Sequence, residues 1–168
     1  MYYADLLNLL MNKAEEAFGK RKQGINIKGV QFDAAGPCIY FNNKDLTDIT
    51  IYISNKCRGN FNLATFQIAH EVIHCLYPNL IEDVTYLEEG LATFFQTQVS
   101  TCIQIESGAT KYITARELVS KLLEFDNNII KAAREVEPNI SKISKDLLAR
   151  FYGGDDEELL DRITAPFY

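Results

Sequence analysis

The chain has 168 residues, of which 47% are hydrophobic and 24% are charged, and its formal net charge is -6. These are ordinary values for a globular protein, and a chain of this length can bury a sizeable core in one domain. The negative charge, with no stripe of Lys and Arg to offset it, argues against a nucleic-acid partner. No apolar run is long enough to span a membrane, and the N-terminus lacks the basic start and cleavage site of a signal peptide. We therefore expect a cytoplasmic protein with no membrane partner.

The first third of the chain predicts a helix followed by a small sheet. Residues 3–18 carry apolar side chains at helical spacing, and Gly19 with the basic run after it ends the helix. Three short runs rich in β-branched and aromatic residues follow, at 25–33, 38–41 and 49–53, with turn-forming residues between them. They predict an antiparallel or mixed sheet of about three strands.

The rest of the chain is predicted to be helical apart from its loops. One helix, with Phe66 and Ile73 on its apolar face, ends at Tyr77 before Pro78. The next begins at Thr85, where Thr85-x-x-Glu88 matches a capping box in which Glu88 folds back on the cap. Further helices are expected at roughly 114–125, 128–136, 141–152 and 156–163.

These elements give an α+β fold class and one domain over residues 1–168. A helix and the sheet occupy 1–55, two helices that carry the candidate site occupy 56–100, and a helical part occupies 101–168. The chain also has four cysteines, Cys38, Cys57, Cys75 and Cys102, none of them in CxxC spacing. In a reducing compartment we expect buried free thiols and no disulfide framework.

Both histidines of the chain lie in one motif, His70-Glu71-Val72-Ile73-His74, which has the pattern H-E-x-x-H. Residues four apart project from one face of a helix, so the two imidazoles can bind one metal ion. Zinc accepts neutral imidazole in a tetrahedral shell, and Glu71 can take a proton from water that the metal activates. We therefore predict one Zn²⁺ per chain and Glu71 as general base. The alternative is that the histidines pack or cap the helix and Glu71 is solvated.

A tetrahedral site with one open position needs a third protein ligand, and with no histidine left this must be a carboxylate or a thiolate. Glu88 and Glu89 stand at the start of the next helix, a short turn after the first. Two antiparallel helices joined in this way can aim a carboxylate at both histidines. The capping box would occupy Glu88 and leave Glu89 free, but Glu88 stays an alternative because helix starts are uncertain by a residue or two.

The segment HEVIH followed by LEEGLATFF resembles the gluzincin metallopeptidases, over about residues 49–96 of this chain. The resemblance implies that Glu89, the acid before the glycine, is the third zinc ligand. It also implies that the strand at residues 49–53 is a sheet edge that binds an extended peptide, the alternative being that this strand is simply part of the core sheet. The chain departs from the family at position 93, where Thr93 replaces an Asp that orients a zinc-bound histidine in many members. It also has no third histidine to stabilise the oxyanion.

A tyrosine is therefore expected to stabilise the oxyanion. Tyr112 is preferred, because the donor must lie across the cleft from Glu71, and Tyr86, Tyr152 and Tyr168 are alternatives. The leading hypothesis is a zinc metallopeptidase that acts on a peptide or protein substrate. One alternative is a metal-binding regulatory or protein-interaction domain with a restricted partner, and another is a structural domain without metal. The intact Glu71 favours the enzyme, since a scaffold would need only the ligands.

Overall fold

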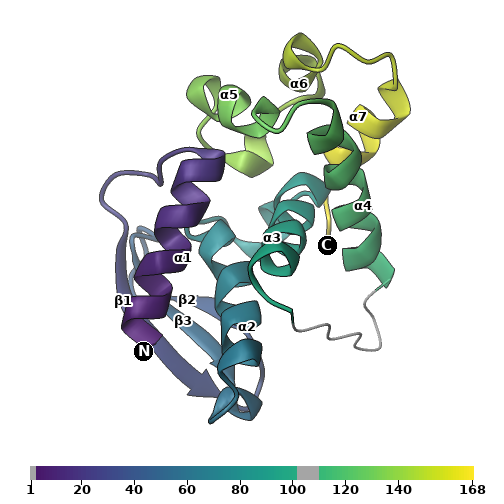
Figure 1. Ribbon diagram of the computed structural model, residues 1–168. Coiled ribbons are helices and arrows are strands. Elements are labelled where there is room, and N and C mark those ends of the chain that lie inside the picture. Colours follow the sequence, from purple (N-terminus) through teal and green to yellow (C-terminus); the bar gives the residue numbers. More distant parts are fainter. Residues whose placement is uncertain (1–2, 102–109) are drawn as a thin grey trace.

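The computed structural model describes residues 3–101 and 110–168, which form seven α-helices and a three-stranded sheet (Figure 1). Short 3-10 turns lie at 55–57, 81–83 and 140–142. The expected α+β class is confirmed. None of the described helices is long and apolar enough to cross a membrane. The elements are α1 (Tyr3–Phe18), β1 (Asn26–Asp33), β2 (Cys38–Phe41), β3 (Asp48–Ser54), α2 (Phe61–His74), α3 (Tyr86–Val99), α4 (Thr110–Phe125), α5 (Ile129–Val136), α6 (Lys145–Phe151) and α7 (Glu157–Ile163).

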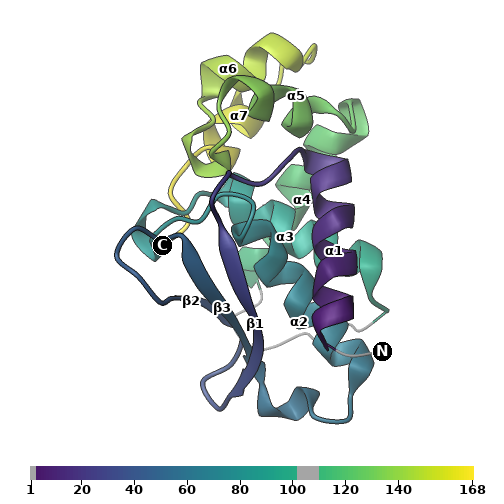
Figure 2. The same cartoon turned by 90° about the vertical axis from the view of Figure 1, so that its left-hand side faces the viewer.

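β3 is the central strand of a mixed sheet. The strand order is β1-β3-β2, with β1 parallel and β2 antiparallel to β3. Ile49, Ile51 and Ile53 alternate onto one face and are completely buried, and Figures 1 and 2 show α1 and α2 on this side of the sheet. The expectation that residues 49–53 form the edge strand is therefore wrong. A run of β-branched residues suits a strand that is paired on both sides, and the shorter β2 forms one of the edges.

The helices begin and end a few residues from their predicted positions. α2 ends at His74 and not at Tyr77, while α4 already begins at Thr110. The helix expected at 141–152 is a 3-10 turn followed by α6, because the Ser144 side chain caps α6 by accepting a hydrogen bond from the Leu147 amide at 3.2 Å. Local side-chain caps thus decide boundaries that apolar periodicity leaves open.

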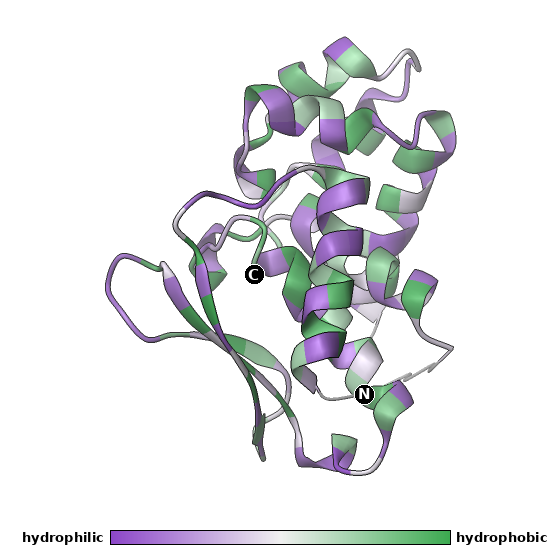
Figure 3. Ribbon diagram, turned by 60° about the vertical axis from the view of Figure 1, so that its left-hand side comes forward, coloured by the Kyte–Doolittle hydropathy of each residue, from purple (hydrophilic) through white to green (hydrophobic). Residues whose placement is uncertain are grey.

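One hydrophobic cluster joins α1, β3 and all the helices that follow. In Figure 3 green and purple residues alternate along the strands, whereas the loop projecting at the left is purple. Cys57 and Cys75 are buried, as expected, and the Cys57 thiol donates a hydrogen bond to Gln67 Oε1 at 3.1 Å. Cys38 is exposed, contrary to the expectation, because it begins the edge strand β2. Cys102 lies outside the described residues.

Arg134 of α5 ties the C-terminal helices to the end of α1. Its guanidinium donates hydrogen bonds to the carbonyl oxygens of Phe18 and Gly19 at 2.8 Å and of Lys20 at 2.9 Å. It also donates to the carbonyl of Pro138 at 3.0 Å. These bonds satisfy carbonyls that a helix end leaves without partners, and a cation is favoured beside them.

Gly90 of α3 is the point of closest approach between α3 and α4. A Cβ atom placed on Gly90 would overlap the carbonyl oxygen of Ala115 and come within 2.7 Å of its carbonyl carbon and of Val119 Cγ2. Two of these atoms belong to the backbone of α4, which cannot move without shifting the helix. A glycine at this position therefore sets the distance between α3 and α4.

We expect Gly90→Ala to destabilise the protein although alanine favours a helix. The overlap with α4 costs about 1–3 kcal/mol or more, against about 1 kcal/mol gained from helix propensity. Gln98→Ala, at an exposed position of the same helix, is the matched control. Urea unfolding should give a lower midpoint for Gly90→Ala and a nearly unchanged one for Gln98→Ala. Equal midpoints would show that α4 yields freely at this contact.

Candidate metal centre

α2 presents both histidines on one face. The Asn60 side chain caps its N-terminus by accepting a hydrogen bond from the Leu63 amide at 3.1 Å. The helix buries its apolar face, including Ile68, Val72 and Ile73, and this fixes the rotation of the helix about its axis. The rings of His70 and His74 then lie side by side, with centroids 5.1 Å apart.

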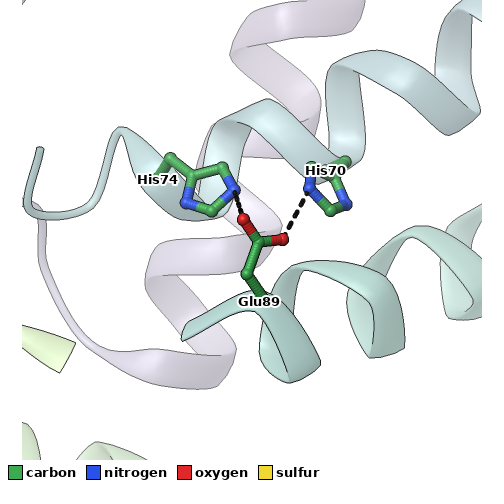
Figure 4. Close-up of side chains that lie close together, drawn as sticks. All are labelled: His70, His74 and Glu89. Carbon is green, nitrogen blue, oxygen red and sulfur yellow. Dashed lines mark ion pairs between the residues drawn. The ribbon is translucent and has the colours of Figure 1, made fainter. Parts of the chain in front are cut away.

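α3 brings Glu89 opposite the two imidazoles (Figure 4). Glu89 Oε2 lies 3.2 Å from His70 Nε2, and Glu89 Oε1 lies 3.7 Å from His74 Nε2. One ligand atom from each residue lies within 4.8 Å of the other two, so the three side chains can hold a metal ion. The structure thus brings together the three residues that the sequence predicts as ligands.

The distances between these atoms suit a single metal ion. Each oxygen of Glu89 faces one of the two imidazoles, and one donor atom from each of the three residues lies within 4.8 Å of the other two. In addition, Glu89 is 3% exposed, and its Oε2 makes no hydrogen bond within the described residues. A buried carboxylate oxygen without a hydrogen bond is costly, and a cation between Glu89 and the imidazoles would satisfy it.

Glu88 is not part of this group and contacts the opposite nitrogen of His74. Its Oε1 lies 2.7 Å from His74 Nδ1, and its Oε2 accepts hydrogen bonds from Asn79 Nδ2 at 2.8 Å and Ser141 Oγ at 2.6 Å. A carboxylate only accepts, so His74 Nδ1 carries a hydrogen, and in the neutral ring the lone pair is on Nε2, the nitrogen on the Glu89 side. Glu88 therefore fixes the tautomer that a metal ligand needs.

The expected capping box does not form. Thr85 is the N-cap of α3, but its side chain makes no capping hydrogen bond, and its amide donates to Ser141 Oγ at 3.0 Å. Glu88 is 1% exposed and turns to His74, where it accepts hydrogen bonds from one buried donor, His74, and from two partly buried ones, Asn79 and Ser141. Thr93 is buried, and its hydroxyl has no partner within the described residues, so it orients neither histidine. Glu88 fills that orienting role.

Three carboxylates, those of Glu71, Glu88 and Glu89, surround the two imidazoles. Burial disfavours the charged form of His74, but Glu89 and Glu88 outweigh it and raise the pKa of His74. Burial raises the pKa of Glu71, and the two histidines only partly offset this. For Glu89 the histidines outweigh burial and lower the pKa. If both imidazoles were neutral, the three carboxylates would favour a divalent cation beside them.

Two tyrosines from the C-terminal half complete the site. Tyr168 Oη donates a hydrogen bond to Glu89 Oε1 at 2.9 Å and lies 3.0 Å from Tyr112 Oη. Because the single hydroxyl hydrogen of Tyr168 goes to Glu89, Tyr112 is the donor in the second bond. The ring of Tyr112 also packs on that of His70, with centroids 6.1 Å apart. The sequence named Tyr168 only as an alternative oxyanion donor. It lies 79 positions after Glu89, so no local pattern indicates that the two side chains meet.

A short chain segment positions Tyr168. The Phe167 amide donates to the Val84 carbonyl at 2.8 Å, and the Tyr86 amide donates to the Ala165 carbonyl at 3.0 Å. The buried Phe167 ring packs on Tyr86 and Tyr112. Tyr86 thus serves this packing and does not line the cavity at the site. Tyr152 is also away from it, because it packs on Phe125.

The three ligand side chains open into a cavity of about 1210 Å³. Its walls come from the edge strand β2 and from α2, α3 and α4, and Glu71, Tyr112 and Tyr168 line it with the ligands. Glu71 is only 4% exposed. The cavity is large enough for several residues of an extended peptide.

Comparisons with protein-family models, with curated protein sequences and with solved structures each gave no match. Functional inference therefore depends on the geometry of this site.

We expect Glu88→Gln to weaken zinc binding about tenfold, because the amide is a weaker acceptor for His74 Nδ1–H and can turn its NH₂ toward the ring. Glu124→Gln, at an exposed position of α4, removes the same charge far from the site and should leave the affinity unchanged. Competition titration against a chromogenic chelator measures both. Equal affinities in the two variants would contradict an orienting role for Glu88.

Proposed function

We propose that this chain is a zinc-dependent metallopeptidase. The observation that carries the proposal is the group of the partly buried His70 and the buried His74 and Glu89, at the wall of a cavity that Glu71 also lines. Metal ligands, a carboxylate next to them and room for a substrate are the parts that hydrolysis by activated water requires.

His70, His74 and Glu89 would hold the ion and leave one position open to the cavity. Zinc, when bound, supplies a Lewis acid that activates water and polarises the peptide carbonyl. Glu88 keeps the Nε2 atom of His74 available as a ligand, and Tyr168 holds one oxygen of Glu89 by its hydrogen bond of 2.9 Å. Both contacts limit rotation of the ligands.

Glu71 would act as general base and then as general acid. It follows the first ligand along α2 and lines the same cavity. Its carboxylate takes a proton from the attacking water and delivers it to the nitrogen of the leaving amine. A buried carboxylate, poorly solvated in its charged form, is a stronger base than one in water.

Tyr112 would stabilise the oxyanion. Its ring lies against His70, and its hydroxyl points to that of Tyr168 at 3.0 Å. Rotation of the Tyr112 hydroxyl hydrogen away from Tyr168 makes it available to a carbonyl oxygen in the cavity, while Tyr168 stays bound to Glu89. The two tyrosines then have separate roles, one toward the substrate and one toward the ligand.

The edge strand β2 would bind the substrate main chain. It pairs with β3 on one side, and Cys38, Ile39 and Phe41 line the cavity. A peptide can add to such an edge through main-chain hydrogen bonds. This role was expected of β3, whose two neighbours in the sheet leave it no free edge.

Replacing Glu71 tests the proposal. We expect Glu71→Gln to keep about one zinc per chain and to lower kcat on a mixed peptide library by about 10²–10⁴-fold. Elemental analysis and a mass-spectrometric cleavage assay measure the two quantities, with Glu124→Gln as the control of equal charge.

Three outcomes would contradict the proposal. Cleavage by Glu71→Gln at the wild-type rate would remove Glu71 from the mechanism. Zinc bound without cleavage in the wild type would favour a metal-binding interaction domain. Well below one zinc per chain, with no rise in melting temperature on adding zinc, would favour a structural domain.

The two tyrosines are distinguished by paired substitutions. We expect Tyr112→Phe to lower kcat by about 10²-fold or more with unchanged zinc affinity, because only the transition state loses a donor. Tyr168→Phe should instead weaken zinc binding about tenfold. Tyr86→Phe, in the same aromatic cluster, is the control. If Tyr112→Phe changed only zinc affinity, its assignment to the oxyanion would be wrong.

A further inference from the structure

Arg116 of α4 is the one Lys or Arg side chain among the described residues that line the cavity. It is partly buried, and within the described part of the chain it has no ion-pair or hydrogen-bond partner. A guanidinium has five N–H donors, and a partly buried one normally uses several of them. The donors of Arg116 therefore face the cavity unused.

Arg134 shows the contrast within the same chain. Its guanidinium is also enclosed, but it donates to four main-chain carbonyls and so has a complete structural role. Arg116 has no such role in the described structure. A guanidinium that the fold does not use, beside a candidate catalytic centre, is suited to a ligand.

Of the described residues, four glutamates line the cavity with Arg116, namely Glu71, Glu82, Glu88 and Glu89, and none of them forms an ion pair with it. Glu88 is occupied by His74, Asn79 and Ser141. Glu89 faces the two histidines and accepts a hydrogen bond from Tyr168. Arg116 is thus available to a negative group from outside the chain.

The position of Arg116 relative to the metal centre follows from α4. Arg116 lies four residues after Tyr112, so both project from one face of the helix, about 6 Å apart along its axis. Tyr112 packs on His70, and the neighbouring Ala115 carbonyl is held against Gly90. Since an extended peptide advances about 3.3 Å per residue, a group bound by Arg116 would lie a few residues from the bond at the metal.

We propose that Arg116 binds a carboxylate of the substrate, either its free C-terminus or an acidic side chain within a few residues of the cleaved bond. The inference rests on the proposed function, because it takes the cavity to hold a peptide. Arginine binds a carboxylate with two parallel hydrogen bonds, and this geometry gives both affinity and register. The glutamates elsewhere in the cavity repel a negatively charged group. Such a substrate would therefore bind in one orientation, with its carboxylate at Arg116.

Four pools of fluorescein-labelled hexapeptides test the proposal. Each pool has either Glu or Gln at one randomised position and either a free carboxylate or an amide at the C-terminus. Binding is measured by fluorescence anisotropy to zinc-loaded Glu71→Gln protein, so that turnover plays no part. The same measurement is made with Arg116→Gln, Arg116→Lys and Lys121→Gln added. Lys121 is exposed on the same helix outside the cavity, so Lys121→Gln removes an equal charge.

We expect at least one carboxylate-bearing pool to bind about tenfold to a hundredfold more tightly than the neutral pool. Arg116→Gln should abolish this preference, Arg116→Lys should keep part of it, and Lys121→Gln should leave it unchanged. A preference for the free C-terminus would identify the terminal carboxylate as the ligand, and a preference for Glu would identify a side chain.

Equal binding of all four pools, no binding of any pool, or an unchanged preference in Arg116→Gln with normal zinc content would overturn the inference. Its failure is separable from failure of the proposed function. A wild-type protein that cleaves peptides without the preference keeps the function and loses this inference. One that shows the Arg116-dependent preference but cleaves nothing keeps the inference and loses the function.

Discussion

The close contact between Gly90 of α3 and the backbone of α4 at Ala115 sets the geometry on which the site depends. Glu89 precedes this glycine, so the carboxylate that faces both imidazoles is fixed by the same contact. On the α4 side of the contact, Tyr112 packs against His70, and Arg116 lines the cavity. A larger residue at position 90 would separate the helices, and the site would lose its alignment before any of its functional side chains changed.

Negatively charged groups outnumber positively charged ones around the two histidines, and their burial makes this excess unfavourable. Glu71, Glu88 and Glu89 are almost completely enclosed, and they face imidazoles that are neutral when they act as ligands. Buried charges normally have partners or bind metals. Three hydrogen-bond donors stabilise the Glu88 carboxylate. The excess negative charge is therefore that of Glu89 and Glu71, next to the place where a cation would lie. The arrangement is the one that the proposed function requires, a group able to hold a divalent ion with a carboxylate beside it.

Residues far along the chain support this centre. Ser141 donates to Glu88, Tyr168 donates to Glu89, and Asn79 links to Asn139 by hydrogen bonds of 2.7 and 3.0 Å between their side chains. The helical C-terminal part therefore contributes hydrogen bonds to the candidate metal centre as well as burying α3 and α4. These hydrogen bonds restrict the side chains at the site to a few rotamers. They therefore lower the entropy cost of ordering those side chains when an ion binds.

The sequence alone determined the local part of this protein. The i, i+4 spacing placed His70 and His74 on one helix face with Glu71 beside them, and β-branched runs located the three strands. Only the tertiary structure decided that β3 is central, that Glu88 orients His74 in place of capping α3, and that Tyr168 and Arg116 face the site. Helical and strand periodicity depend on neighbours a few positions apart. Which donor meets a buried carboxylate depends instead on how separate elements pack, and no local pattern records that.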